Sequence, residues 1–344
     1  MLGDASQIII TSQPEAAVIA LNEIQKIDQG ARGKRLSAEV QLVTTPNGYS
    51  TIKNMLSDTI FIRHVFPINA TYLVGEAGLN QKLLDLCYEI PEGESFSVQM
   101  RDSSSKAISA EVKELISFVE QGMTLKGYVC DNKNPAWVLS LYMHENQMYA
   151  GVSQCSHNLS KWNGGVHRLK RSEVFVSRAE HKLEEAIESF GISLNQNCVK
   201  HAIDLGAAPG GWTKVLLEYG FHVTAVDPGK LSDVLHDHPR LVHFRDVAQR
   251  FAGKEGSYDL LVNDMRMDII ESAKIMLDMA SLLSPDGAAV MTLKLPHKQW
   301  YKNVKRTLLL LQNKYVIVNA RQLFHNRSEV TVYLKKLGGF HGCH

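Results

Sequence analysis

The segment 201-HAIDLGAAPGGWTKVLLEYG-220 places a short strand-like run, a glycine-rich loop and an amphipathic stretch in direct succession. Apolar residues dominate the run before Gly206, and they recur at helical spacing after Gly211. Glycines between a strand and a helix let the backbone approach a ligand closely, at the positive end of the helix. The segment therefore predicts an α/β domain with a ligand site at this loop.

The same alternation continues to the end of the chain. Further strand-like runs cover 221–227, 241–246, 258–264 and 288–295, and stretches with helical spacing cover 269–284 and 297–312. Two last β-rich runs, 315–324 and 329–337, have no helix between them and predict an antiparallel hairpin at the end of the sheet. We expect a Rossmann-like, doubly wound and mainly parallel seven-stranded sheet.

The N-terminal half has a different organisation. Strand-like runs at 7–12, 61–68 and 94–102 are mixed with helical ones at 14–27 and 109–123, and a β-rich stretch covers 126–154. This mixture predicts an α+β region. We place a boundary in the polar, glycine-containing stretch 156–172, where Arg168, Lys170 and Arg171 make the chain locally basic. That stretch is either a solvated linker or a contact for RNA phosphates.

Composition restricts the class of protein. The 344 residues suffice for two or three domains, and the net charge of +1 gives no global signal for nucleic acid or membrane. The five cysteines are scattered without a CxxC pair, which favours free thiols in a reducing compartment over disulfides or a zinc site. Neither a signal peptide nor a long apolar run is apparent, so we expect a cytoplasmic protein without a metal or a membrane partner.

The loop departs from the GxGxxG fingerprint that holds a dinucleotide pyrophosphate, which argues against a nicotinamide-dependent oxidoreductase. A ligand such as S-adenosylmethionine has only a carboxylate and an ammonium group to hold in this position. Candidate cofactor contacts in the loop are Gly206, Ala208, Pro209, Gly210, Gly211 and Trp212.

Aspartates follow three successive predicted strands, at the edge where such sheets bind ligands. Asp227 is placed to accept from both ribose hydroxyls of the cofactor, and Asp246 is placed to reach an adenine amino group. Asp264 is expected beside the methyl-transfer centre. These three complete the predicted cofactor site.

Lys294 lies in the apolar run 288–295, which is bounded by Gly287 and Pro296 and has the pattern of a strand buried on both faces. A lysine there is costly unless it is paired or loses its charge. Because Lys294 is near the carboxyl end of the strand, its ammonium group is expected at the edge of the sheet where the ligand binds. Lys182, on a helix before the first strand, and Glu329, at the start of the last, are expected to converge on it.

Five stretches, SRAEHKLEEA, DLGAAPGGWT, LLVNDM, TLKLP and NRSEVTVYL, together resemble the FtsJ-type ribose 2′-O-methyltransferases. The resemblance implies a catalytic tetrad of Lys182, Asp264, Lys294 and Glu329, and S-adenosylmethionine as cofactor. Within that family, the sequence most resembles members that act on a cytidine of 23S rRNA and carry an N-terminal THUMP domain, which is an RNA-binding module. It implies a ferredoxin-like subdomain at 1–90, a THUMP-like domain at 91–158, a linker at 159–172 and a methyltransferase domain at 173–338.

The expected partner is therefore RNA, most simply large-subunit rRNA or its precursor, and not DNA. Lys294 either takes the proton of the ribose hydroxyl, if its pKa is lowered, or stays charged and stabilises the developing alkoxide. Two other functions stay open from the sequence: 2′-O-methylation of tRNA, and a non-catalytic RNA-binding or ribosome assembly factor.

Overall fold

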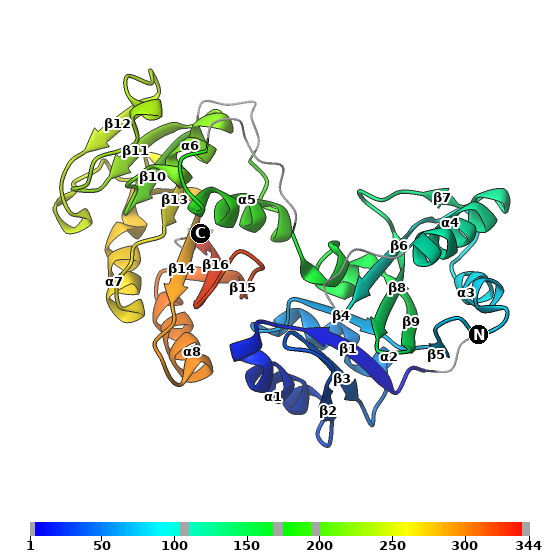
Figure 1. Cartoon of the computed structure of the whole chain (residues 1–344). Helices are drawn as coiled ribbons and strands as arrows, with labels where there is room; N and C mark the ends of the chain where they lie inside the picture. The colour runs from blue at the N-terminus through cyan, green and yellow to red at the C-terminus, as the bar shows by residue number, and fades with distance from the viewer. Residues whose placement is uncertain (1–3, 104–109, 168–174, 195–199, 339–344) are drawn as a thin grey trace, which may run out of the picture. The chain divides into compact units, whose positions relative to one another are not determined.

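The computed structural model describes residues 4–103, 110–167, 175–194 and 200–338. The chain divides into two compact units, Met1–Arg168 and Leu169–His344 (Figure 1). The division falls inside the predicted linker 159–172, although the basic residues Arg168, Lys170 and Arg171 lie outside the described residues. In the described part of the chain, no helix is long and apolar enough to cross a membrane.

The first unit begins with a four-stranded antiparallel sheet of order β2-β3-β1-β4. Its elements are β1 (Gln7–Thr11), α1 (Ala17–Ile27), β2 (Arg32–Arg35), β3 (Val40–Thr44), α2 (Tyr49–Ile52) and β4 (His64–Pro67). A β-α-β-β-α-β succession with this sheet order is the ferredoxin-like arrangement.

A five-stranded sheet of order β5-β9-β8-β6-β7 follows. Its elements are β5 (Ala70–Leu73), α3 (Leu79–Cys87), β6 (Ser95–Asp102), α4 (Ala110–Leu125), β7 (Val129–Cys130), β8 (Trp137–His144) and β9 (Gln147–Gln154). Helices α3 and α4 lie side by side and share one hydrophobic core with the sheet (Figure 1). The predicted boundary at residue 90 does not separate the two sheets, because β5 already belongs to the five-stranded sheet and α3 to its hydrophobic core. Strand β5 pairs with β9, which is far from it in the sequence, so the local hydrophobic pattern does not reveal this pairing.

The second unit is built on a seven-stranded sheet of order β12-β11-β10-β13-β14-β16-β15. Its elements are α5 (Ala179–Ser189), β10 (His201–Leu205), α6 (Gly211–Glu218), β11 (His222–Val226), β12 (Leu241–Phe244), β13 (Tyr258–Asn263), α7 (Ile269–Met279), β14 (Leu283–Lys294), α8 (Trp300–Leu311), β15 (Tyr315–Arg321) and β16 (Glu329–Lys336). Strands β10 to β14 pair in parallel, and β16 pairs antiparallel with both β14 and β15. The predicted doubly wound sheet and its terminal hairpin are confirmed.

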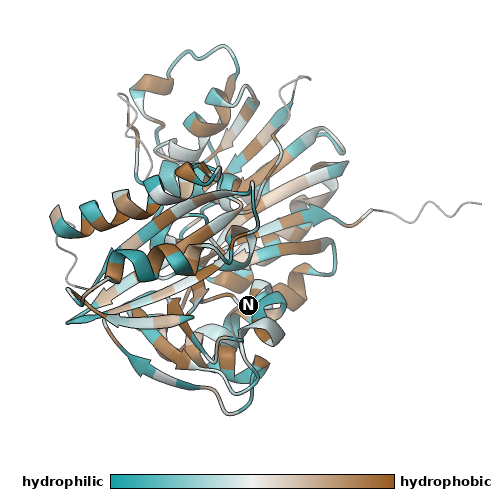
Figure 2. Ribbon diagram, turned by 90° about the vertical axis from the view of Figure 1, so that its right-hand side faces the viewer, coloured by the Kyte–Doolittle hydropathy of each residue, from teal (hydrophilic) through white to brown (hydrophobic). Residues whose placement is uncertain are grey.

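Helices cover this sheet in two pairs. Helix α5 packs on α6 and helix α7 packs on α8 (Figure 1). Hydrophobic and hydrophilic residues alternate along the helices (Figure 2). Leu183 of α5, Val215 of α6 and Val262 of β13 are among the buried side chains of a core that joins α5 and α6 to the sheet. This packing fixes α5 against the strands, which matters because α5 carries Lys182.

The carboxyl ends of β10, β11, β13 and β14 meet at one edge of the sheet, since these strands are parallel. Strand β16 runs in the opposite direction, so its first residue arrives at that same edge. The ladder places Glu329 directly opposite Lys294. From β10 the chain first adds β11 and β12 on one side of the sheet, and it then returns to the other side of β10 with β13. The place where the strand order reverses in this way is the topological switch point, at which such sheets bind ligands.

Candidate active site

The loop after β10 has a backbone that only glycine adopts easily at two positions. Gly206 has φ +73° and Gly210 has φ +109°. A Cβ atom on Gly206 would lie 2.5 Å from Cγ of Met265, and one on Gly210 would lie 2.2 Å from Cδ1 of Leu235. Both glycines are therefore required for the loop to pass this close to its neighbours.

Asp227 ties the loop to the end of β11. Its carboxylate accepts hydrogen bonds from the backbone N–H groups of Ala208 at 3.1 Å and Gly229 at 2.6 Å. A carboxylate held at the switch point fits the predicted contact with ribose hydroxyls, so the residues present suit S-adenosylmethionine. Asp246 is placed differently: it is bound to the N–H of Val247 at 2.8 Å and lies 3.3 Å from Nη1 of Arg250. No hydrogen bond described in the structure links Asp246 to the loop.

Two predicted cofactor residues, Gly211 and Trp212, lie against α5 and the residues just before it. The indole of Trp212 is only 2 % exposed and donates from Nε1 to the carbonyl of Ala179 at 2.7 Å. A Cβ on Gly211 would lie 2.2 Å from Oγ of Ser177, so this glycine permits the close approach of α5. Trp212 is therefore part of the core that joins α5 and α6 to the sheet, and its contact with the cofactor stays a prediction.

Four charged side chains from four elements converge at the carboxyl edge. Nζ of Lys182 lies 2.8 Å from Oε1 of Glu329 and 3.5 Å from Oδ2 of Asp264. Nζ of Lys294 donates to Oδ1 of Asp264 and lies 3.4 Å from Oε1 of Glu329. The side chains are 15–18 % exposed, so the cluster is largely buried but open to solvent. We call these four residues the tetrad.

The tetrad is electrostatically balanced, with two lysines and two carboxylates. Burial opposes the charge on Lys182, but the carboxylates of Asp264 and Glu329 outweigh it and raise the pKa of Lys182. Burial likewise opposes the charge on Glu329, but Lys294 and Lys182 outweigh it and lower the pKa of Glu329. Lys182 and Glu329 are therefore held in their charged forms at neutral pH.

Sequence reasoning missed two buried groups beside the tetrad. Thr292 on β14 is 1 % exposed and donates from Oγ1 to Oδ1 of Asp264 at 2.5 Å, which fixes that carboxylate from the side of the strand. Asp204 on β10 is 1 % exposed and accepts from Oγ1 of Thr213 at 2.6 Å. Burial, together with the charges of Asp264 and Asp227, raises the pKa of Asp204 to about 7. Asp204 interrupts an apolar strand as Lys294 does, and that signal could have identified it.

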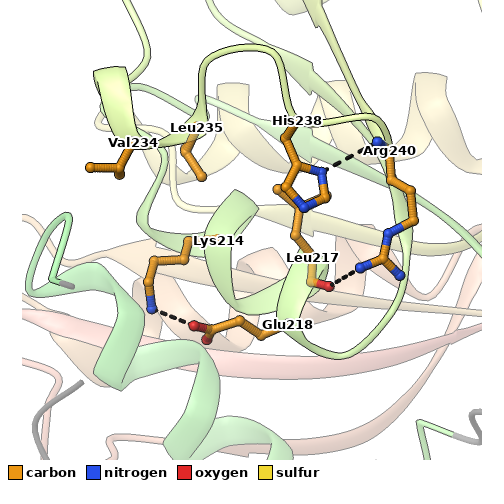
Figure 3. A pocket seen from close by; sticks show the side chains of 7 residues that line it. All are labelled: Lys214, Leu217, Glu218, Val234, Leu235, His238 and Arg240. Carbon is orange, nitrogen blue, oxygen red and sulfur yellow. Dashed lines mark hydrogen bonds and ion pairs between the residues drawn. The ribbon is translucent and has the colours of Figure 1, made fainter. Parts of the chain in front are cut away.

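A separate pocket of about 320 Å³ lies beside α6 and the turn 233–235 (Figure 3). Its polar side chains have partners nearby: Lys214 lies 2.7 Å from Glu218, and Arg240 donates to the backbone carbonyl of Leu217. His238 accepts from the backbone N–H of Arg240 through Nδ1. None of the seven lining residues labelled in Figure 3 belongs to the tetrad, so we place the active site at the tetrad and not in this pocket.

The comparison with known families agrees with this geometry. The FtsJ-like methyltransferase family matches residues 175–302. The matched segment contains the loop after β10 and three members of the tetrad, Lys182, Asp264 and Lys294, and it ends before Glu329.

Curated relatives extend the similarity into the N-terminal unit. The Histophilus somni protein named ribosomal RNA large subunit methyltransferase M is 30 % identical over 302 residues, covering 83 % of this chain and 80 % of its own. Proteins of the same name from Aggregatibacter aphrophilus and Psychromonas ingrahamii are 32 % and 28 % identical. The first covers 66 % of this chain and 68 % of its own, the second 75 % and 71 %. The chain is therefore a methyltransferase with S-adenosylmethionine as its cofactor, and it belongs to the family of the ribosomal RNA large subunit methyltransferase M.

Proposed function

We propose that this protein transfers the methyl group of S-adenosylmethionine to a ribose 2′-hydroxyl of large-subunit rRNA, at a cytidine. The names of the relatives support rRNA of the large subunit as substrate. The observation that carries the chemistry is the tetrad, because a ribose hydroxyl is a poor nucleophile at neutral pH and needs a group that takes its proton. The choice of cytidine rests on the resemblance of the sequence alone.

Lys294 is the residue we assign to the proton. S-adenosylmethionine supplies an electrophilic methyl group when bound at the loop after β10. Methyl transfer would form a carbon–oxygen bond to the ribose as the carbon–sulfur bond of the sulfonium breaks, and Nζ of Lys294 is the group that would take the 2′-hydroxyl proton. A positioned general base of this kind contributes about 10²- to 10⁴-fold to a rate.

The other three members hold and balance Lys294. Asp264 accepts from Lys294 and from Thr292, so the lysine amine has a fixed direction. Glu329 lies across from it in the strand ladder and contacts both lysines. Lys182, whose pKa is raised, keeps its positive charge and offsets the negative charge that develops on the attacking oxygen.

The N-terminal unit is the part we assign to RNA binding. We propose that the ferredoxin-like sheet and the five-stranded sheet after it present the RNA, with the THUMP-like region falling within the second sheet. We propose 173–338 as the methyltransferase domain, joined to these sheets by the linker 159–172. Support comes from the relatives, whose similarity continues into this unit over most of their length.

The deciding experiment uses two matched large-subunit rRNA fragments and purified protein. The methylated position is first mapped by mass spectrometry of nucleosides. A fragment with a single 2′-deoxynucleotide at that position should then accept no methyl group, whereas methylation of the deoxy fragment would refute the ribose assignment. Methylation of tRNA alone would move the substrate, and no methylation of either RNA would favour a binding or assembly factor.

A second arm tests Lys294. Lys294→Met should reduce turnover by about 10²-fold or more while calorimetry shows unchanged affinity for S-adenosylmethionine. Lys335→Met, at an exposed lysine on β16, is the matched control and should keep full activity. Retained turnover in the Lys294 variant would refute the base assignment.

A further inference from the structure

Four aromatic rings form a continuous row beside the tetrad, in the same unit. The ring of Phe175 lies 5.3 Å from that of His181 on α5, and His181 lies 5.2 Å from His325 in the turn before β16. His325 in turn lies 5.2 Å from Phe324. Each separation is a ring contact, so the four rings are connected in succession, and we call them the aromatic row.

The aromatic row shares its supporting elements with the tetrad. His181 immediately precedes Lys182 on α5, and the turn that carries Phe324 and His325 leads directly into Glu329. Because Lys182 and Glu329 are themselves 2.8 Å apart, the two segments that carry the rings are held together at the active site.

A buried carboxylate fixes this arrangement. Glu185 on α5, with a side chain only 4 % exposed, accepts from the backbone N–H groups of Phe324 at 2.7 Å and His325 at 2.8 Å. Its Oε2 also lies 2.8 Å from Nδ1 of His325. Burying a carboxylate is costly unless it is fully bonded, and here its bonds go to the two residues that carry rings. Asn326 adds rigidity, since its Oδ1 accepts from the N–H of Leu323 at 2.9 Å.

The row is accessible to a ligand. Phe175 is 46 % exposed, and Phe324, His181 and His325 are partly exposed. Rings that served only to pack the turn against α5 would be expected in the core, as Trp212 is. An ordered and partly exposed row of rings next to a site for RNA has the properties of a stacking surface, because each nucleobase offers a π-face to an aromatic side chain.

We propose that the aromatic row is a binding site for a nucleobase of the substrate RNA, that of a nucleotide flanking the one methylated. This inference rests on the proposed function. Stacking on the row holds the strand while the target ribose meets the tetrad, and it tolerates any base since no base edge is read. Phe175 provides the most exposed ring, and His181 joins it to the turn that leads into Glu329.

The test combines variants with abasic RNA. Phe175→Leu keeps an apolar side chain but removes the ring, and Phe175→Trp restores one. Phe175→Leu should raise KM for RNA by about 5- to 150-fold, with affinity for S-adenosylmethionine and the melting temperature unchanged, and Phe175→Trp should stay near wild type. Leu309→Ala on α8, which removes another exposed apolar side chain, is the control and should leave KM unchanged.

The decisive measurement is the coupling between ring and base. The affinity of the wild type for RNA should fall when the nucleotide on one side of the target is made abasic. Phe175→Leu already lacks the ring, so its affinity should be the same for the abasic RNA and for the intact RNA. The proposal is refuted if the wild type methylates RNA and both Phe175→Leu and Phe324→Leu show the wild-type KM for RNA and the wild-type loss of affinity at the abasic site. If wild type methylates no RNA, the proposed function itself has failed, so the two failures are distinguishable.

Discussion

Replacing Asp204 by asparagine should change the pH dependence of stability in a way that identifies this buried group. Asp204 is 1 % exposed, and its pKa is raised to about 7 by burial and by the charges of Asp264 and Asp227. In the unfolded chain the carboxyl titrates near its ordinary value of 3.8. Between these two values the folded protein binds more protons than the unfolded one, so this group lowers stability as pH rises through that window.

The magnitude follows from the two pKa values. At about 1.36 kcal/mol per pH unit, the penalty is absent below pH 3.8 and reaches about 4 kcal/mol above pH 7. Between pH 5 and pH 9 it grows by about 3 kcal/mol. The amide introduced by Asp204→Asn has no such titration and can still accept from Oγ1 of Thr213, so this variant should gain stability over wild type by that amount across the interval.

The assay is chemical denaturation of variant and wild type in parallel at pH 5, 7 and 9. The quantity that matters is the difference in unfolding free energy between the two proteins, because the titration of groups that do not interact with Asp204 cancels in it. Asp286→Asn, at an exposed position of β14, is the control and should give a difference that does not vary with pH. A pH-independent difference for Asp204→Asn would refute the reasoning, since it would mean that Asp204 is already ionised in the folded protein at pH 5.

Three further substitutions test the site. Thr292→Val removes the hydroxyl that donates to Asp264. Since a hydrogen bond to a charged group is worth about 1.5–3 kcal/mol, turnover should fall about 10- to 100-fold while the affinity for the cofactor stays unchanged. Unchanged turnover would contradict the positioning role of Thr292. Asp227→Asn should weaken S-adenosylmethionine binding in calorimetry by at least about 10-fold, because the loop loses a charged acceptor, and equal affinity would place the cofactor elsewhere. Glu185→Gln should lower the melting temperature and raise KM for RNA together, since it loosens the turn before β16; a stability change without a KM change would make Glu185 purely structural.

The fold of the second unit could be predicted from local sequence patterns. Strands and helices alternate from β10 onward, and the hydrophobic periodicity that reveals them is local, so each element could be read from its own residues. The same holds for the loop, where Gly206 and Gly210 are required by backbone geometry within a few residues. The resemblance in five short stretches also named the tetrad, because each stretch keeps its own pattern.

The groups that surround those residues could not be predicted, because they are brought there by tertiary packing. Thr292 reaches Asp264 and Glu185 reaches the turn before β16 through sheet register and helix packing, which join positions far apart in the chain. Trp212 became a core residue for the same reason, since α5 covers its side of α6. The start of the second N-terminal sheet at β5 depends on pairing with β9. Contacts of this kind depend on how elements pack together, and the periodicity of a single segment carries no information about the segment it will meet.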